Sequence, residues 1–216
     1  MSELLFNELP RPTFRWLRVN HTVSSLAGED TAVQSIAVEA NKDILSPLPV
    51  GTALLDGNYE GANKEAVHVL VEKAEGYAIN VPPKAKEVVG IRIDANARVA
   101  NRFQFIVGEG AELEVQFYVT GSGDALTNVS YLNEYDVKEA GKVVVKKVNL
   151  LPEHVQHIEH RYTKLEEKAD VEYINIEIGG SENILNYYHD LVGQESRMVH
   201  DIAYLGNKEQ KFDISM

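Results

Sequence analysis

Runs of alternating apolar and polar residues recur along most of this chain, and turns rich in charge or glycine separate them. In the second half of the sequence, new runs begin after turns at Ala111, Gly141, Lys168 and Ser196, at intervals of about 27 to 30 residues. Such alternation is typical of half-buried β-strands. A repeat of this length indicates a solenoid, in which each unit buries its apolar face only by stacking on its neighbours. The pattern therefore predicts an all-β fold, a β-solenoid.

Two runs in the middle of the chain show the clearest separation of an apolar and a polar face. Their polar positions include Arg102 and Gln104, which we expect on a solvated face. Further alternation predicts short strands within 67–71, 77–81 and 89–93. The positions that we expect in the core are Phe103, Phe105, Val115, Phe117, Ile174, Ile176 and Ile178.

The composition changes near residue 61. A stretch rich in proline and glycine at 45–61 marks a boundary between an arm and a body. We therefore predict an N-terminal arm with boundary loops over 1–61 and a β-helix core over 62–216. Within the arm, weak alternation at 31–40 favours a strand over a helix.

The N-terminal segment combines prolines with aromatic residues. Pro10 and Pro12 prevent a regular helix there and favour an extended arm. We expect Phe14 and Trp16 to pin this arm to the body by burying aromatic area. Docking of the arm to a partner protein is the alternative.

Charge and cysteine content exclude several classes of protein. The chain has a net charge of −12 and no block of lysine and arginine, so a nucleic-acid partner is not expected. Its apolar runs are far shorter than the roughly 20 residues of a membrane span, and its N-terminus lacks a signal pattern. We therefore expect a cytoplasmic protein that does not enter a membrane. The absence of cysteine removes disulfides, thiolate metal sites and cysteine nucleophiles.

Three histidines, His154, His157 and His160, form the pattern H-x-x-H-x-x-H. On a helix they would share one face and suit zinc or iron. The flanking residues favour a strand, where His154 and His160 share one face and His157 lies on the other. We therefore expect surface or edge histidines, and a metal-binding all-β protein remains an alternative.

Two His-Asp pairs, at 189–190 and 200–201, occupy similar places beside turns. A proton relay or an iron site is one interpretation. A polar ladder, in which the pairs stack in successive coils, is the structural interpretation that we prefer. The sequence contains no P-loop, nucleophile elbow or dinucleotide fingerprint in its required context.

Three stretches carry a resemblance to a known family. They are LPRPTFRWLRVN, then VPPKAKEVVGIRIDANARVANRFQFIVGEGAELEVQFYV, then VNLLPEHVQHIEHRYTKLEEKADVEYINIEIGG with ENILNYYHDLVGQESR and IAYLGNKEQKFDIS after it. Together they resemble the SufB/SufD family, the paired scaffold subunits of the SUF machinery for iron–sulfur cluster assembly. The resemblance covers most of the chain and is vaguest at 51–76.

This resemblance implies a right-handed parallel β-helix with a peripheral N-terminal segment. It also implies a non-catalytic scaffold subunit that meets a SufB-type paralogue and a SufC-type ABC ATPase. In the family the sulfur-accepting cysteine belongs to the SufB-type partner, so a chain without cysteine is SufD-like or a partial scaffold. We expect the isolated chain to bind no cofactor, and an iron–sulfur cluster to form transiently in the full complex.

Family members continue beyond the position that matches Ile214, with further coils and a helical tail that docks the ATPase. The SufD-type interface histidine lies in that part, so the resemblance assigns no catalytic, cofactor-binding or metal residue to this sequence. Free strand edges and the apolar Phe212 and Ile214 predict a homo-oligomer through the C-terminal end. A β-helix carbohydrate-active enzyme is a further alternative, which would need acidic residues clustered on a groove.

Overall fold

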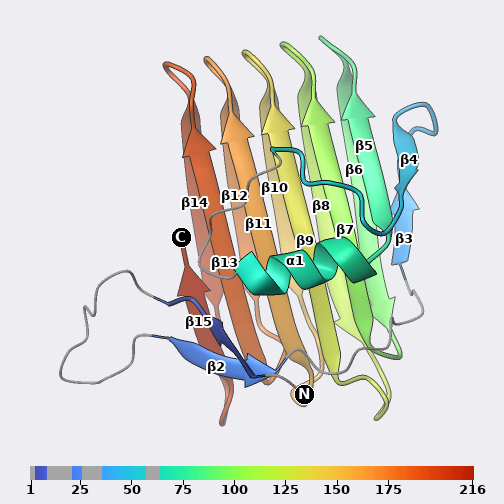
Figure 1. The fold of residues 1–216 in the computed structure, drawn as a ribbon, viewed down its shortest axis with the longest axis vertical. Coiled ribbons are helices and arrows are strands. Elements are labelled where there is room, and N and C mark those ends of the chain that lie inside the picture. Colours follow the sequence, from blue (N-terminus) through green and yellow to red (C-terminus); the bar gives the residue numbers. More distant parts are fainter. Residues whose placement is uncertain (1–2, 9–20, 26–35, 57–63) are drawn as a thin grey trace, which may run out of the picture.

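The computed structural model describes residues 3–8, 21–25, 36–56 and 64–216. The described chain alternates between two parallel sheets and forms a β-solenoid of about five coils (Figure 1). In spatial order, the six-stranded sheet consists of β14 (Arg197–Tyr204), β12 (Asp170–Glu177), β10 (Lys142–Asn149), β8 (Glu112–Gly121), β6 (Lys86–Ala95) and β3 (Ile36–Glu39). The seven-stranded sheet consists of β15 (Lys211–Ser215), β13 (Glu182–Leu191), β11 (Gln156–Leu165), β9 (Asn128–Val137), β7 (Val99–Val107), β5 (Gly76–Val81) and β4 (Leu45–Leu48).

The repeat predicted from the turns is confirmed by the register of the six-stranded sheet. Lys142 pairs with Glu112 on one side and with Asp170 on the other, and Asp170 pairs with Arg197. The strands β6, β8, β10, β12 and β14 each begin two residues after a residue with positive φ. In the same order, those residues are Lys84, Gly110, Ala140, Lys168 and Glu195. A left-handed residue turns the chain sharply, so the same turn resets the strand at every coil.

Among the described strands of the two large sheets, only β3 and β4 run antiparallel to their neighbours, at the end of the solenoid where the chain enters it. The strand predicted within 31–40 is β3, which pairs with β6. Both strands belong to residues that we assigned to the arm and boundary loops. They extend the two sheets of the body by one strand each.

The first coils enclose a continuous apolar core between the sheets. Phe105 stacks on Tyr135 with ring centroids 4.5 Å apart, and Phe103 meets Phe117 edge-on at 5.4 Å. Phe103, Phe105, Val115 and Phe117 are fully or almost fully buried, as predicted. The alternating pattern predicted the burial of these side chains correctly, because they line the space between the two sheets.

The helix α1 (Lys64–Lys73) lies across the outer face of the seven-stranded sheet (Figure 1). The prediction of a strand within 67–71 is therefore wrong. Val67, Val69 and Val71 alternate, but Ala66, Val67 and Leu70 also recur at helical spacing, and these three face the sheet. Among the described residues, no helix has the length and apolar character needed to cross a bilayer.

A segment before α1 covers Arg102 and Gln104, which contradicts their expected exposure. Arg102 donates to the carbonyl of Thr52 at 2.8 Å and to Glu134 at 3.2 Å. Gln104 donates to Glu134 at 2.9 Å, and the backbone N–H of Leu55 donates to the same carboxylate at 2.9 Å. The sequence could not show this cover, because the covering segment is distant in the chain.

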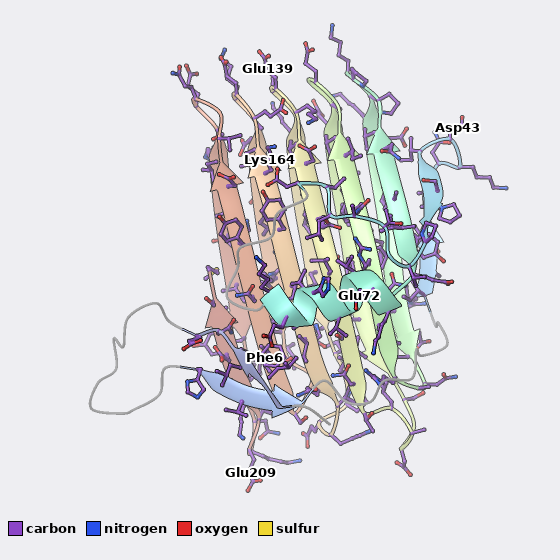
Figure 2. The ribbon with its side chains drawn as sticks, viewed as in Figure 1. Phe6, Asp43, Glu72, Glu139, Lys164 and Glu209 are labelled. Atoms are coloured by element: carbon purple, nitrogen blue, oxygen red, sulfur yellow. The ribbon has the colours of Figure 1, made fainter. Side chains whose placement is uncertain are left out.

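The hairpin of β1 (Glu3–Phe6) and β2 (Thr22–Ser25) covers the same sheet near its C-terminal strands. Figure 2 shows Phe6 at this junction, where its side chain is fully buried. Asn7 donates to Asp213 of β15 at 2.8 Å. Phe14 and Trp16, which we expected to pin the arm, lie outside the described residues, so Phe6 is the aromatic anchor that the structure shows.

The outer face of the six-stranded sheet has no covering layer among the described residues. Ile176 and Ile178 lie on this face and are 38% and 40% exposed, and Ile174 beside them is half-buried. Their predicted burial is wrong, because β12 points its other face inward. That inward face carries Tyr173, Asn175 and Glu177. The interior of this part of the solenoid is polar.

Candidate functional site

The same inward position changes its chemistry from coil to coil. In the six-stranded sheet one such row reads Ile91, Phe117, Lys147 and Asn175, and the next reads Ile93, Val119, Asn149 and Glu177. In the seven-stranded sheet a facing row reads Phe103, Asn133, Arg161 and Tyr187. All these side chains are buried. The apolar core of the first coils thus gives way to a polar interior in the later ones.

Lys147 is the centre of an ion cluster inside the solenoid. Its ammonium group contacts Glu159, which faces it from the other sheet, and Glu177 at 2.5 Å, on the adjacent strand. The three side chains are at most 1% exposed. Burial would raise the pKa of the Glu159 carboxyl, but Arg161 and Lys147 outweigh it and hold this pKa below its usual range. Burial raises the pKa of Glu177, against the opposing effect of Lys147.

Arg161 extends the cluster along β11. Its guanidinium donates to Glu159 at 2.6 Å and lies between the rings of Tyr173 and Tyr187, with 4.2 Å from Cζ to each ring centroid. Tyr187 and Asn133 both donate to Glu159 at 3.0 Å. The carboxylate of Glu159 is therefore held by charge and by hydrogen bonds from both sheets.

His157 joins the cluster at its other side. Its Nε2 lies 2.9 Å from the Tyr131 hydroxyl, and its Nδ1 lies 3.0 Å from Asn149 and 3.1 Å from Asn183. Burial lowers the pKa of His157 to about 3. The imidazole is therefore neutral at neutral pH and connects the ion cluster to a row of amides.

The three histidines of the H-x-x-H-x-x-H pattern do not converge. His154 is exposed in the turn before β11, His157 points into the solenoid, and His160 points to the opposite face of the strand. His157 and His160 lie on opposite faces of β11, as predicted, whereas His154 precedes the strand, and the predicted surface locations of His157 and His160 are wrong. His157 is buried between the two sheets, and His160 is buried because the hairpin and α1 cover the outer face. No three His, Cys, Asp or Glu side chains of the described chain gather as metal ligands.

His189 and His200 do not stack within one sheet, as the ladder interpretation required. His189 belongs to β13 and His200 to β14, on opposite sides of the interior, with ring centroids 6.2 Å apart. Both rings lie close to Tyr173. Burial lowers the pKa of His189 to about 3 and that of His200 to about 4.

Sequence reasoning missed the charged residues of this site. Lys147, Glu159 and Arg161 stand among alternating residues that suit a solvated strand face. The available signal was the stretch 174–178, in which isoleucines alternate with Asn175 and Glu177, because the polar side of this stretch is the inward one. A charge at an inward position costs free energy unless it is paired, so pattern alone favours the apolar face as the inner one.

These features define a class: a parallel β-solenoid with an apolar core and, in its later coils, a buried ion cluster. The family model for the SUF system FeS cluster assembly SufBD core domain matches residues 91–216, more than half of the chain. The chain therefore belongs to the SufB/SufD family of iron–sulfur cluster assembly, as the resemblance in its sequence predicted. The searches of curated proteins and of solved structures found no match.

Proposed function

We propose that this chain is a non-catalytic, SufD-like scaffold subunit, and that it works with a SufB-type paralogue and a SufC-type ABC ATPase. The match to the SufBD core domain carries this proposal, since the core belongs to a family of assembly scaffolds. The absence of cysteine supports the SufD-like role, because stable clusters usually need thiolate ligands. A partner would supply them.

The C-terminal end of the described solenoid supports an interface there. Tyr204 and Leu205, at the end of β14, are 61% and 66% exposed, and Leu191, at the end of β13, is 46% exposed. Exposed apolar side chains favour association. A SufB-type paralogue is the occupant we propose, and a second copy of this chain is the alternative.

Co-expression tests the partnership. We expect the chain to co-elute with a SufB-type and a SufC-type protein, and the Tyr204→Lys/Leu205→Asp double variant to elute alone while keeping its circular dichroism spectrum. Glu72→Lys, a change on the exposed face of α1, is the matched control and is expected to leave the complex intact (Figure 2). Co-elution of only copies of this chain would favour the homo-oligomer. Wild-type chain that stays a free monomer would contradict both interfaces.

Reconstitution tests the cofactor expectation. Anaerobic incubation with iron and sulfide is expected to leave the isolated chain without a stoichiometric visible charge-transfer band, while the complex with the partner develops one. A band on the isolated chain would contradict the passive scaffold role. Cleavage of polysaccharides by the purified chain would instead favour the carbohydrate-active alternative.

A further inference from the structure

The guanidinium of Arg161 has hydrogen-bonding capacity that the protein does not use. Its side chain is fully buried, its Cζ lies 4.2 Å from the ring centroids of both Tyr173 and Tyr187, and Nη2 donates to Glu159. Nε and Nη1 have no hydrogen-bond partner in the described part of the chain. Buried N–H groups are almost always satisfied. The N–H donors of a guanidinium lie in its plane, so a partner for these two groups must lie in that plane.

His189 and His200 stand beside the two rings that hold this guanidinium. The His200 ring lies 4.9 Å from Tyr187 and 5.4 Å from Tyr173, and the His189 ring lies 5.7 Å from Tyr173. Both histidine rings therefore lie beside the tyrosines that contact the guanidinium of Arg161. Charge on Arg161 also contributes to the low pKa of both histidines, which places them near it.

The amide of Asn175, as oriented in the structure, donates from Nδ2 to His200 Nε2 at 2.9 Å. In this arrangement Nε2 is the acceptor, and the neutral ring carries its proton on Nδ1. That Nδ1 has no partner within the described residues, and neither nitrogen of His189 has one. Arg161 and both histidines therefore offer unused N–H donors.

We propose that Arg161, His189 and His200 form an internal site for a small monovalent inorganic anion of the size of chloride or bromide. Unpartnered donors and a fixed positive charge lie beside the same two tyrosine rings, and an anion accepts hydrogen bonds without needing to donate any. Neutral His189 also offers one acceptor nitrogen, so the positive charge of Arg161 is what favours an anion over water. The enclosing tyrosines favour an ion of one or few atoms, and low dielectric strengthens its attraction to the guanidinium.

The position of the site gives a small ion a route from solvent. His189 and His200 are only partly buried, and Met198 and Ile202, which flank His200 on the inward face of β14, are partly exposed as well. The site depends on neither the scaffold role nor the partner, so its test is separate from that of the proposed function.

Bromide is the probe that tests this site. In crystals of the full chain grown with sodium bromide, we expect an anomalous peak within hydrogen-bonding distance of Arg161 and of one or both histidines. In solution, bromide is expected to raise the melting temperature above its value in sodium gluconate at equal ionic strength, because gluconate is too large for the site. Water without anomalous signal in this place, or equal melting temperatures in both salts, would overturn the proposal.

Two variants and one control separate the site from general salt effects. His200→Leu removes one donor and is expected to weaken bromide binding about tenfold. Arg161→Met is expected to abolish it. His160→Leu, the same change at a buried histidine on the outer face of β11, is the control and is expected to keep the full bromide shift. If Arg161→Met does not fold, His200→Leu alone decides, and an unchanged bromide shift in that variant rejects the site.

Discussion

The strands β6, β7 and β8 enclose mainly isoleucine, valine and phenylalanine, whereas β10 to β13 enclose lysine, arginine, glutamate, histidine and tyrosine beside a few valines. The backbone repeats with the same register through both regions. The coil geometry therefore does not depend on what fills it. The difference shows that stability and chemistry are distributed unequally along one solenoid.

The energetics of the two regions differ in kind. Burying a large apolar side chain contributes about 1.5–3 kcal/mol to the free energy of unfolding. A buried ion cluster roughly offsets its own desolvation cost, and apolar replacements of similar volume are often neutral or stabilising. The first coils thus account for much of the stability. The cluster of Lys147, Glu159, Glu177 and Arg161 is better explained by a functional role than by stability. Substitutions in the cluster test this difference between the two regions.

The largest effect is expected from removing one member of the cluster. Glu159→Leu leaves Lys147 with a single carboxylate and deprives Arg161 of its ion-pair partner. Losing one partner of a buried pair costs about 3–5 kcal/mol. We expect urea unfolding to show a loss of this size in the free energy of unfolding.

The matched control removes the whole cluster. A variant that combines Lys147→Met, Glu159→Leu, Arg161→Met and Glu177→Leu is expected to recover most of the stability lost in Glu159→Leu. The reason is that it leaves no buried charge of this cluster without a partner. If the combined variant is no more stable than Glu159→Leu, the cluster holds the later coils together and the proposed division of roles is wrong.

Much of the fold could be predicted from the sequence because the turns repeat. The restarts at Gly141 and Ser196 lie one residue before β10 and β14. Phe103 and Phe117 were placed correctly in the core because only one face of each strand is apolar. These features are local, and local pattern is what a single sequence carries.

The site could not be predicted because its members are brought together by stacking and by facing sheets. Glu159 and Glu177 lie one coil apart on opposite sheets, and both contact Lys147. The two-sided burial of β11 likewise depends on a hairpin and a helix from the N-terminal third of the chain. Apolar alternation in β12 then favoured the wrong face, because Ile176 is more apolar than the inward Asn175.

An intermediate effect is expected from pH, and the two histidines that cause it belong to β11. Burial lowers the pKa of His157 to about 3 and that of His160 to about 4, against about 6.5 in an unfolded chain. Between these values the unfolded chain binds more protons, so stability present above about pH 6.5 is lost as the pH falls. Each fully buried histidine contributes at most about 1.4 kcal/mol per pH unit. Glu134 and Glu177, whose pKa values burial raises, act with the opposite sign and partly offset this loss.

His160→Leu isolates the contribution of one histidine. The nitrogens of His160 have no hydrogen-bond partner in the described part of the chain, so leucine loses no bond there. We expect the variant to gain stability relative to the wild type as the pH falls from about 7 to about 5. Urea unfolding across this range measures the difference. A constant difference at all pH values would show that His160 does not titrate on unfolding as its burial requires.

The smallest effect is expected on the outer face of the six-stranded sheet, and it checks which face of β12 points inward. Ile176 is 38% exposed, whereas Val115, on the inward face of β8, is fully buried. Ile176→Thr places a hydroxyl near water and is expected to change the free energy of unfolding by less than about 0.5 kcal/mol. Val115→Thr keeps the side-chain shape but buries a hydroxyl in the apolar first coils, at a cost of about 1–3 kcal/mol. If urea unfolding shows comparable losses for the two variants, then either another layer covers Ile176 or the inner and outer faces of β12 are not divided as the register indicates.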